Sequence, residues 1–148
     1  MPRIERSADV VWHGNLARGG GNLSAATGAF RELAFSEPSR VGAPEGKTSP
    51  EELLAAAHAG CYAMSLAGEL ARTPPERLDV TATVVMDEVE GKGHRIVASQ
   101  LRVRARVPGL DEATFSRAVE AADAGCPFSA LIKASADVAI DATLEGGG

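Results

Sequence analysis

Cysteine, histidine and aromatic residues are scarce in this chain. Its 148 residues include two cysteines, three histidines and 4% aromatics. Two cysteines are too few for the disulfide framework of a small secreted domain. The histidines stand far apart and show none of the spacings of a metal site, so neither a metal nor another cofactor is expected. The chain has no run of about 18 apolar residues, which excludes a membrane-spanning helix.

A basic stripe is also missing. The net charge is -5, with acidic and basic residues interspersed, and few aromatic rings are available to stack on bases, so nucleic acid is not an expected partner. No apolar segment follows the charged N-terminal residues, which favours a cytoplasmic protein. With 45% apolar residues, the chain can build one domain with its own core, over residues 1–148.

The order of the predicted elements indicates an α+β domain, with strands and helices in separate runs. Alternating and helical patterns predict strands over 8–13, 23–26, 78–90, 94–107 and 137–145, and helices from Ser49 to the prolines at 74–75, over 111–124, and over a short stretch ending at 134. The glycine run inside 15–22 reads as a turn, and residues 36–48 read as a long loop.

The long helix carries the clearest local signals. Ser49 can cap it, Pro50 fits its first position, and Glu52 completes a capping box. Cys61 lies on its apolar stripe, at helical spacing from Leu54 and other small or apolar residues. In the strand over 94–107, arginines alternate with apolar residues. That row could bind an anion, although a solvated sheet face is the simpler interpretation.

The two cysteines occupy different helical settings. Cys126 precedes Pro127 at the start of a short helix, where unpaired N–H groups favour an anion. Cys61 lies ten residues inside its helix, and burial there would raise its pKa. A reactive Cys61 therefore needs a cation from elsewhere, for which arginine is the best supplier. On these grounds, two inert buried cysteines are as well supported as a reactive pair of thiols.

His58 stands one helical turn before Cys61. A Cys–His pair on one helix face would suggest acyl-transfer chemistry. No orienting residue or oxyanion donor is identifiable, so a packed or hydrogen-bonded histidine is the commoner outcome. Tyr62 and Phe128 are candidates for the apolar wall of a pocket or for ordinary core, as is Met64.

Two separated motifs resemble those of the OsmC/Ohr family, the osmotically inducible and organic hydroperoxide resistance proteins. They are SPEEL at 49–53 with AAAHAGC at 55–61, and VPGLD at 107–111 with AGCPFS at 124–129. The likeness runs from the WHG at 12–14 to the last strand, and the second motif pair favours the OsmC branch.

The resemblance implies an OsmC-like fold, an intertwined homodimer with antiparallel sheets around a long central helix. It implies a thiol peroxidase that reduces organic hydroperoxides, with hydrogen peroxide as a second candidate substrate, and that needs no metal or prosthetic group. Cys61 would attack the peroxide, and Cys126 would resolve the resulting sulfenic acid as a disulfide that a dithiol, such as a lipoyl group, reopens. Arg18 would hold the thiolate ionised, and Glu51 would fix that arginine.

Helix geometry adds a constraint on Glu51. At about 1.5 Å per residue, Glu51 lies roughly 15 Å along the helix axis from Cys61. A glutamate side chain cannot span that distance, so we expect Glu51 and Arg18 to serve Cys61 of a partner subunit. The alternative function is a non-catalytic dimer that binds a small molecule or an acyl chain. A hydrolase that uses Cys61 and His58 is a third hypothesis.

Overall fold

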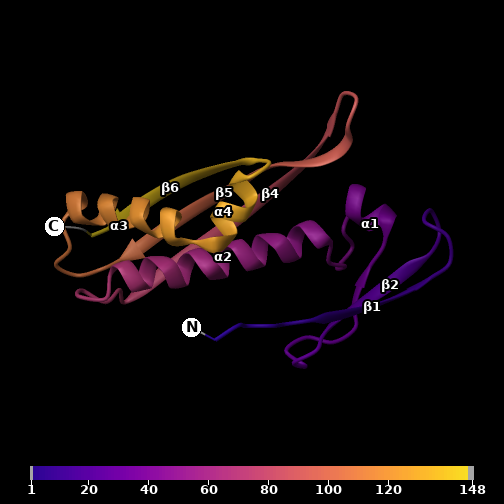
Figure 1. Cartoon of the computed structure of the whole chain (residues 1–148), viewed down its shortest axis with the longest axis horizontal. Helices are drawn as coiled ribbons and strands as arrows, with labels where there is room; N and C mark the ends of the chain where they lie inside the picture. Colours follow the sequence, from indigo (N-terminus) through magenta and orange to yellow (C-terminus); the bar gives the residue numbers. More distant parts are fainter. Residues whose placement is uncertain (1, 147–148) are drawn as a thin grey trace. The chain divides into compact units, whose positions relative to one another are not determined.

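The computed structural model describes residues 2–146, which form two compact units, one ending at Pro50 and one beginning at Glu51. Both units combine strands and helices, so the predicted α+β class is confirmed (Figure 1). The single domain expected over 1–148 stays a prediction.

The N-terminal unit is a three-stranded antiparallel sheet followed by a single helical turn. Its elements are β1 (Ala8–His13), β2 (Gly20–Ala25), β3 (Leu33–Phe35) and α1 (Glu37–Val41), with the strands in the order β1-β2-β3. The expected loop over 36–48 is wrong in its first part, because α1 forms there. Ser36 caps α1 through a hydrogen bond from the backbone N–H of Ser39 to its hydroxyl, at 3.2 Å.

The glycine run also differs from its prediction as a turn. Gly20 and Gly21 belong to β2, where Gly21 pairs with Trp12 on one side and Phe35 on the other. The ring centroids of Trp12 and Phe35 lie 5.6 Å apart, and the ring planes are tilted by 57° to each other. A Cβ atom on Gly21 would come within 2.8 Å of the Phe35 ring and 2.9 Å of the Trp12 ring. The glycine is therefore part of the strand because it leaves room for the aromatic pair.

The C-terminal unit packs three helices against a second sheet. Its elements are α2 (Pro50–Glu69), β4 (Arg77–Val89), β5 (Gly93–Arg106), α3 (Glu112–Gly125), α4 (Pro127–Lys133) and β6 (Asp137–Glu145). The long helix begins at Pro50 as predicted and ends several residues before the proline pair. The strand order is β4-β5-β6, and β6 runs parallel to β5, whereas only antiparallel sheets were expected.

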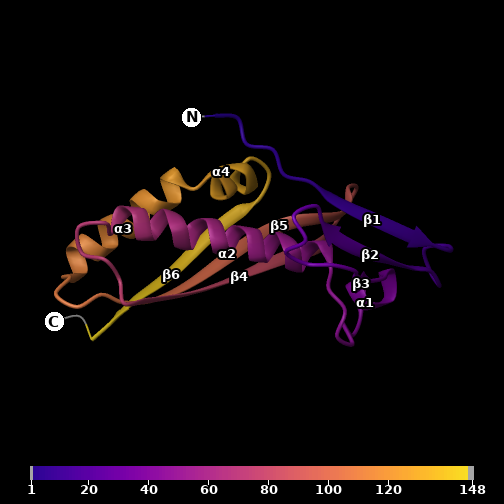
Figure 2. The same cartoon turned by 90° about the horizontal axis from the view of Figure 1, so that it is seen from below.

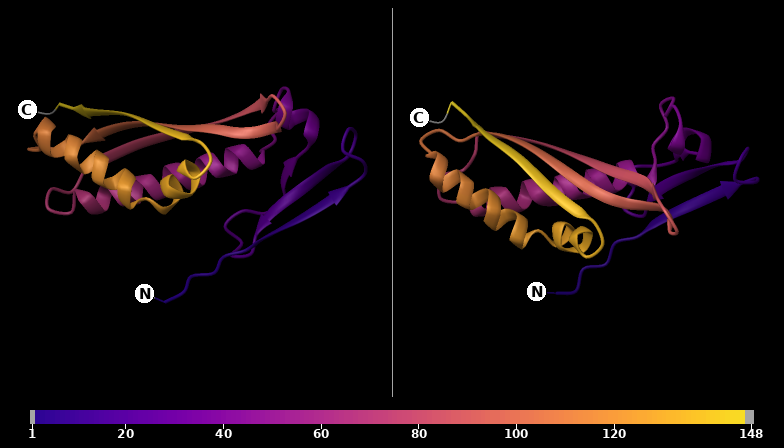
Figure 3. Two further views of the ribbon diagram at one scale, coloured as in Figure 1. Left: turned by 45° about the horizontal axis from the view of Figure 1, so that its top comes forward. Right: turned by 90° about the horizontal axis from the view of Figure 1, so that it is seen from above.

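The helices α2, α3 and α4 lie on one face of this sheet (Figures 1 and 3). The core between the layers is built from alternate residues of β5, including Leu101 and Val103, together with Tyr62 and Leu66 of α2. The arginines of β5 point to the exposed face, as predicted, and Arg104 forms an ion pair with Glu145 of β6 at 2.5 Å. In the described residues 2–146, no helix is both long and apolar enough to cross a membrane.

Candidate active site

The two cysteines meet in the C-terminal unit, although 65 positions separate them in the sequence. Cys61 lies in α2, and Cys126 lies at the junction of α3 and α4. Figure 2 shows α3 and α4 beside α2. Their sulfur atoms are 3.4 Å apart, and both thiols are free. Cys126 is fully buried, whereas Cys61 is partly exposed. A small approach of the two sulfurs would therefore suffice for a disulfide.

The surroundings of Cys61 favour its protonated form. Burial raises the pKa of the Cys61 thiol, and the neighbouring Cys126 raises it further. A hydrogen bond from the backbone N–H of Phe128 acts in the opposite direction but is the smaller influence. No cation of the described part of the C-terminal unit contributes to this balance. Within this unit, the surroundings of Cys61 therefore disfavour its thiolate form.

The start of α4 lies close to both thiols and directs one backbone N–H at Cys61. The sequence suggested that unpaired N–H groups there would assist Cys126, which does occupy the N-cap position. Within residues 2–146, however, the Cys126 side chain accepts no capping hydrogen bond, and the Phe128 N–H is directed at the Cys61 sulfur. The predicted N-cap position of Cys126 is therefore confirmed, whereas the predicted effect of that position on its thiol stays a prediction.

His58 is engaged away from the thiols. Its Nδ1 atom lies 2.6 Å from the hydroxyl of Ser99 in β5, and its Nε2 atom lies 2.8 Å from the hydroxyl of Ser129 in α4. All three side chains are fully buried. Burial lowers the pKa of His58, an effect that Asp123 partly opposes. With both ring nitrogens occupied, His58 does not act as the base of a Cys–His pair, and the hydrolase hypothesis loses its main support.

Two of the candidate pocket residues have clear positions. Tyr62 is fully buried, and its hydroxyl donates a hydrogen bond to the Val119 carbonyl at 3.0 Å, so it belongs to the core. Burial raises the pKa of its hydroxyl well above the ordinary value. Met64 is 78% exposed on the opposite side of α2.

The other two predicted site residues lie elsewhere in the chain. Arg18 is exposed in the connection between β1 and β2, which belongs to the N-terminal unit. Its backbone N–H bonds to the side chain of Asn15 at 2.8 Å. Glu51 stands in the first turn of α2, where a carboxylate suits the positive end of the helix dipole. The structure thus brings Cys61 and Cys126 together, and Glu51 sits ten residues from Cys61 along one continuous helix.

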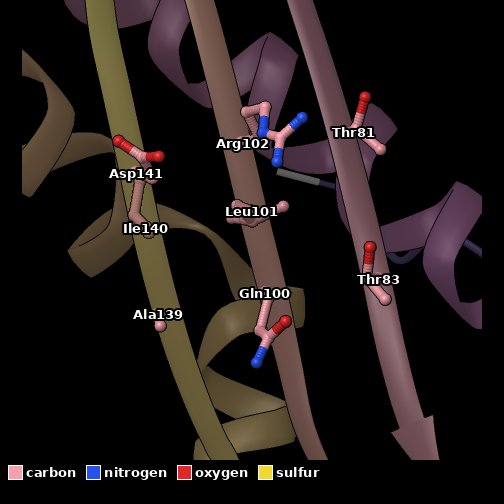
Figure 4. Close-up of a pocket in the computed structure, with 8 residues that line it drawn as sticks. All are labelled: Thr81, Thr83, Gln100, Leu101, Arg102, Ala139, Ile140 and Asp141. Carbon is pink, nitrogen blue, oxygen red and sulfur yellow. The ribbon is translucent and has the colours of Figure 1, made fainter.

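A hollow of about 370 Å³ opens on the exposed face of the second sheet (Figure 4). Its lining residues come from β4, β5 and β6 and are Thr81, Thr83, Gln100, Leu101, Arg102, Ala139, Ile140 and Asp141. Neither cysteine is among them, because both thiols lie on the helical side of the sheet. Among residues 2–146, no cluster of three or more His, Cys, Asp or Glu side chains could hold a metal ion.

Known proteins share both the sequence and the fold. The chain is 35% identical over 145 residues to Peroxiredoxin OsmC of Escherichia coli strain K12, covering 96% of this chain and 98% of that protein. It is 27% identical over 137 residues to the organic hydroperoxide resistance protein of Xanthomonas axonopodis pv. citri strain 306, covering 88% of this chain and 94% of that protein.

Solved structures agree with these relatives in fold. An organic hydroperoxide resistance protein OsmC from Legionella pneumophila matches with a TM-score of 0.71 at 22% identity, over 95% of this chain and 99% of that one. An OsmC-like protein of unknown function from Vibrio cholerae matches with a TM-score of 0.77 at 16% identity, over 95% and 100%. The sequence pattern of OsmC-like proteins matches residues 42–141, the segment that contains both cysteines. With this match, the shared fold and the full-length likeness to Peroxiredoxin OsmC, the chain belongs to the OsmC-like protein family.

Proposed function

We propose that this protein is a thiol peroxidase that reduces organic hydroperoxides with its two cysteines. The observation that carries the proposal is the 3.4 Å separation of the Cys61 and Cys126 sulfurs on separate elements. Two free thiols at this distance can deliver two electrons to one oxidant and end as a disulfide. Relatives named Peroxiredoxin OsmC and organic hydroperoxide resistance protein support both the activity and the class of substrate.

The exposure of the two thiols supports their roles. Cys61 is partly exposed, and Cys126 is fully buried, so an incoming peroxide meets Cys61 first. The Cys61 thiolate attacks one oxygen of the O–O bond, which gives a sulfenic acid and releases an alkoxide that takes up a proton. The Cys126 thiol then attacks the sulfenic sulfur, forms the disulfide and releases water. A dithiol reductant, for which a lipoyl group is suited, restores both thiols by exchange.

Arg18 is the proposed source of the missing positive charge. Because burial raises the pKa of Cys61, the thiolate needs a nearby cation, and within the described residues no cation is among the influences on this pKa. An arginine would also stabilise the departing alkoxide. Glu51 is proposed to orient that arginine through a charge-assisted hydrogen bond. Glu51 and Cys61 of one chain are separated by ten residues of α2. We therefore assign both Arg18 and Glu51 at each thiol to the partner subunit.

Uncovered apolar surface supports a homodimer. Within residues 2–146, every member of the hydrophobic core lies in the C-terminal unit. The adjacent residues Val10 and Val11 of β1 point to opposite faces of their sheet and are each 54% exposed. On α2, Met64 and Gly60 form part of an exposed face of low bulk, and a Cβ atom on Gly60 would meet nothing within 4 Å. A second copy that covers these surfaces would remove them from water.

Steady-state turnover tests the proposal. Consumption of cumene hydroperoxide is followed with dihydrolipoate as reductant, for wild type and for the variants Cys61→Ser and Cys126→Ser. We expect turnover in wild type, none with Cys61→Ser, and early inactivation with Cys126→Ser because the sulfenic acid is left unresolved. If wild type consumes no hydroperoxide with any dithiol, the peroxidase assignment fails and the non-catalytic binding dimer becomes the better account.

A further inference from the structure

A buried hydrogen-bonded bridge links three elements next to the two thiols. It consists of Ser99 in β5, His58 in α2 and Ser129 in α4, joined by contacts of 2.6 Å and 2.8 Å. We call it the serine–histidine bridge. Two of its members flank the thiols in sequence, since His58 comes three positions before Cys61 and Ser129 three positions after Cys126. The bridge therefore ties together the two segments that carry the sulfurs.

The bridge is complete when the imidazole is neutral. A neutral histidine has one donor and one acceptor nitrogen, and a serine hydroxyl can serve either. Both tautomers thus satisfy all three groups, which matters because an unsatisfied buried polar group is costly. Burial lowers the pKa of His58 and keeps the ring in this neutral form near pH 7. The network can accordingly act as a rigid connection between helices.

Helix α4 is held by contacts with its neighbours, among them an ion pair from Lys133 to Asp123 of α3. It has only seven residues, and a helix this short has little stability of its own. The preceding α3 is held to α2 by separate bonds, from the Tyr62 hydroxyl to the Val119 carbonyl and from the Ser65 hydroxyl to the Ala122 carbonyl at 2.7 Å. Between α2 and α4, His58 and Ser129 form a buried side-chain hydrogen bond.

We propose that His58 is a positioning residue for the resolving step, which it controls through Ser129 by holding α4 in place. In that place the Cys126 sulfur and the Phe128 N–H both face the Cys61 sulfur. The role in catalysis rests on the proposed peroxidase function. The geometric effect does not, because fixing α4 also raises the effective concentration of one thiol at the other in any oxidation to the disulfide.

A dithiothreitol redox titration tests the geometric effect without peroxide. The reduced protein and oxidised dithiothreitol exchange to give the protein disulfide and reduced dithiothreitol, with two electrons and two protons passing to the reagent. The disulfide fraction is read by intact mass after acid quenching. The equilibrium constant measures how well the fold holds the sulfurs together.

Two variants of His58 distinguish the two hydrogen bonds of the bridge. We call the bond from His58 to Ser99 the β5 arm and the bond from His58 to Ser129 the α4 arm. The amide of His58→Asn reaches the level of Nδ1 and can keep the bond to Ser99, whereas the longer amide of His58→Gln reaches the level of Nε2 and can keep the bond to Ser129. Ser129→Ala removes the α4 arm directly. Tyr62→Phe is the matched control, since it deletes one buried hydrogen bond from α2 to α3 and leaves the bridge intact.

The expected results follow from which arm holds α4. The equilibrium constant should fall about fivefold to tenfold in Ser129→Ala and His58→Asn, and stay within about twofold of wild type in His58→Gln and Tyr62→Phe. An equal fall in Ser129→Ala and Tyr62→Phe would show general loosening and overturn the proposal. An unchanged value in both Ser129→Ala and His58→Asn would overturn it as well.

Treatment with hydroperoxide then separates this proposal from the peroxidase function. If peroxide oxidises Cys61, variants without the α4 arm should accumulate more sulfinic acid and less disulfide than wild type, because resolution is slower. If wild type ignores peroxide while the dithiothreitol constants fall as expected, the peroxidase function is wrong and the positioning role of His58 stands. If peroxide oxidises wild type and the dithiothreitol constants do not fall, the positioning role of His58 is wrong and the peroxidase function stands.

Discussion

At the scale of single residues, the chemistry depends on the charge state of Cys61. Burial and the neighbouring Cys126 raise the pKa of its thiol, and the Phe128 N–H offsets only part of this. A thiol with a raised pKa is mostly protonated near neutral pH, and the protonated form does not attack peroxides. The proposed mechanism therefore depends on a cation near Cys61, and Arg18 is the residue proposed to supply it.

Arg18→Ala should slow the oxidation of Cys61 by cumene hydroperoxide by about 100-fold at pH 7, the usual effect of removing one electrostatic stabiliser. Without the cation, the Cys61 pKa moves upward, so the midpoint of the rate against pH should shift to higher pH and the loss should shrink in alkaline solution. Stopped-flow mixing across pH 6–10 measures both effects.

The control for Arg18→Ala is Arg31→Ala, which removes another exposed arginine of the same unit. It should leave the rate and its pH dependence unchanged. Equal rate losses in the two variants would indicate a general effect of charge, and an unaltered midpoint in Arg18→Ala would refute its assigned role.

At the scale of elements, the second β-strand shows how a glycine is used for packing. Gly21 lies where the tilted rings of Trp12 and Phe35 close over the strand. A Cβ atom there would also come within 2.7 Å of the Val11 carbonyl oxygen. At the neighbouring Gly20 the nearest atom is the Phe35 carbonyl oxygen, at 3.6 Å. Gly20 therefore has room for a Cβ atom, whereas Gly21 does not.

Gly21→Ala should destabilise the N-terminal sheet by about 1–3 kcal/mol, the usual cost of overpacking. Trp12 is the single tryptophan of the chain, so its fluorescence reports on this unit alone. Urea unfolding followed at Trp12 should show a lower midpoint for Gly21→Ala, and for Gly20→Ala a midpoint near that of wild type. A normal midpoint in Gly21→Ala would mean that the ring pair does not need the glycine.

The elements differ in how far the sequence predicted them. The start of α2 and the strands β1 and β6 follow from capping residues and alternation, which act locally. The three-residue β3 and the single turn of α1 were missed because segments so short carry almost no periodic signal. The sequence pattern predicts Gly21 in a turn, because the two rings that require a glycine there lie in the neighbouring strands and give no local signal.

The candidate site divides in the same way. The family motifs identified both cysteines, and the structure then placed their sulfurs together. The serine–histidine bridge could not be predicted, because Ser99 and Ser129 lie 41 and 71 positions from His58 in the sequence. A buried serine in β5 and another in α4 have no distinctive pattern. Only the packing of α4 against α2 reveals their common partner.

At the scale of the whole molecule, the chain leaves much apolar surface uncovered. The exposed large apolar residues are Ile4, Val10, Val11, Leu16, Val41, Met64 and Leu131. The three-stranded N-terminal sheet contributes no member to the hydrophobic core among residues 2–146. Sheets of this size need a packed apolar face for stability. The proposed homodimer provides such cover and also supplies the partner's arginine to each thiol.

Met64→Arg should weaken the homodimer, because it places an unpaired charge on the exposed face of α2 that the second copy would bury. We expect the dissociation constant to rise at least about 100-fold. Sedimentation velocity over a range of concentrations measures it. Glu69→Arg, a charge reversal farther along the same helix, is the control and should leave association unchanged. A wild-type protein that is monomeric at all concentrations would contradict the dimer.

The central claim is that Cys61 and Cys126 act in sequence on one peroxide. Intact mass and thiol titration, before and after one equivalent of cumene hydroperoxide, test it most directly in wild type, Cys61→Ser and Cys126→Ser. Wild type should lose two thiols and about 2 Da. Cys126→Ser should gain about 16 Da on Cys61, or more on further oxidation, and Cys61→Ser should remain unchanged. Two thiols that stay untouched in wild type, even with excess peroxide, would contradict the account.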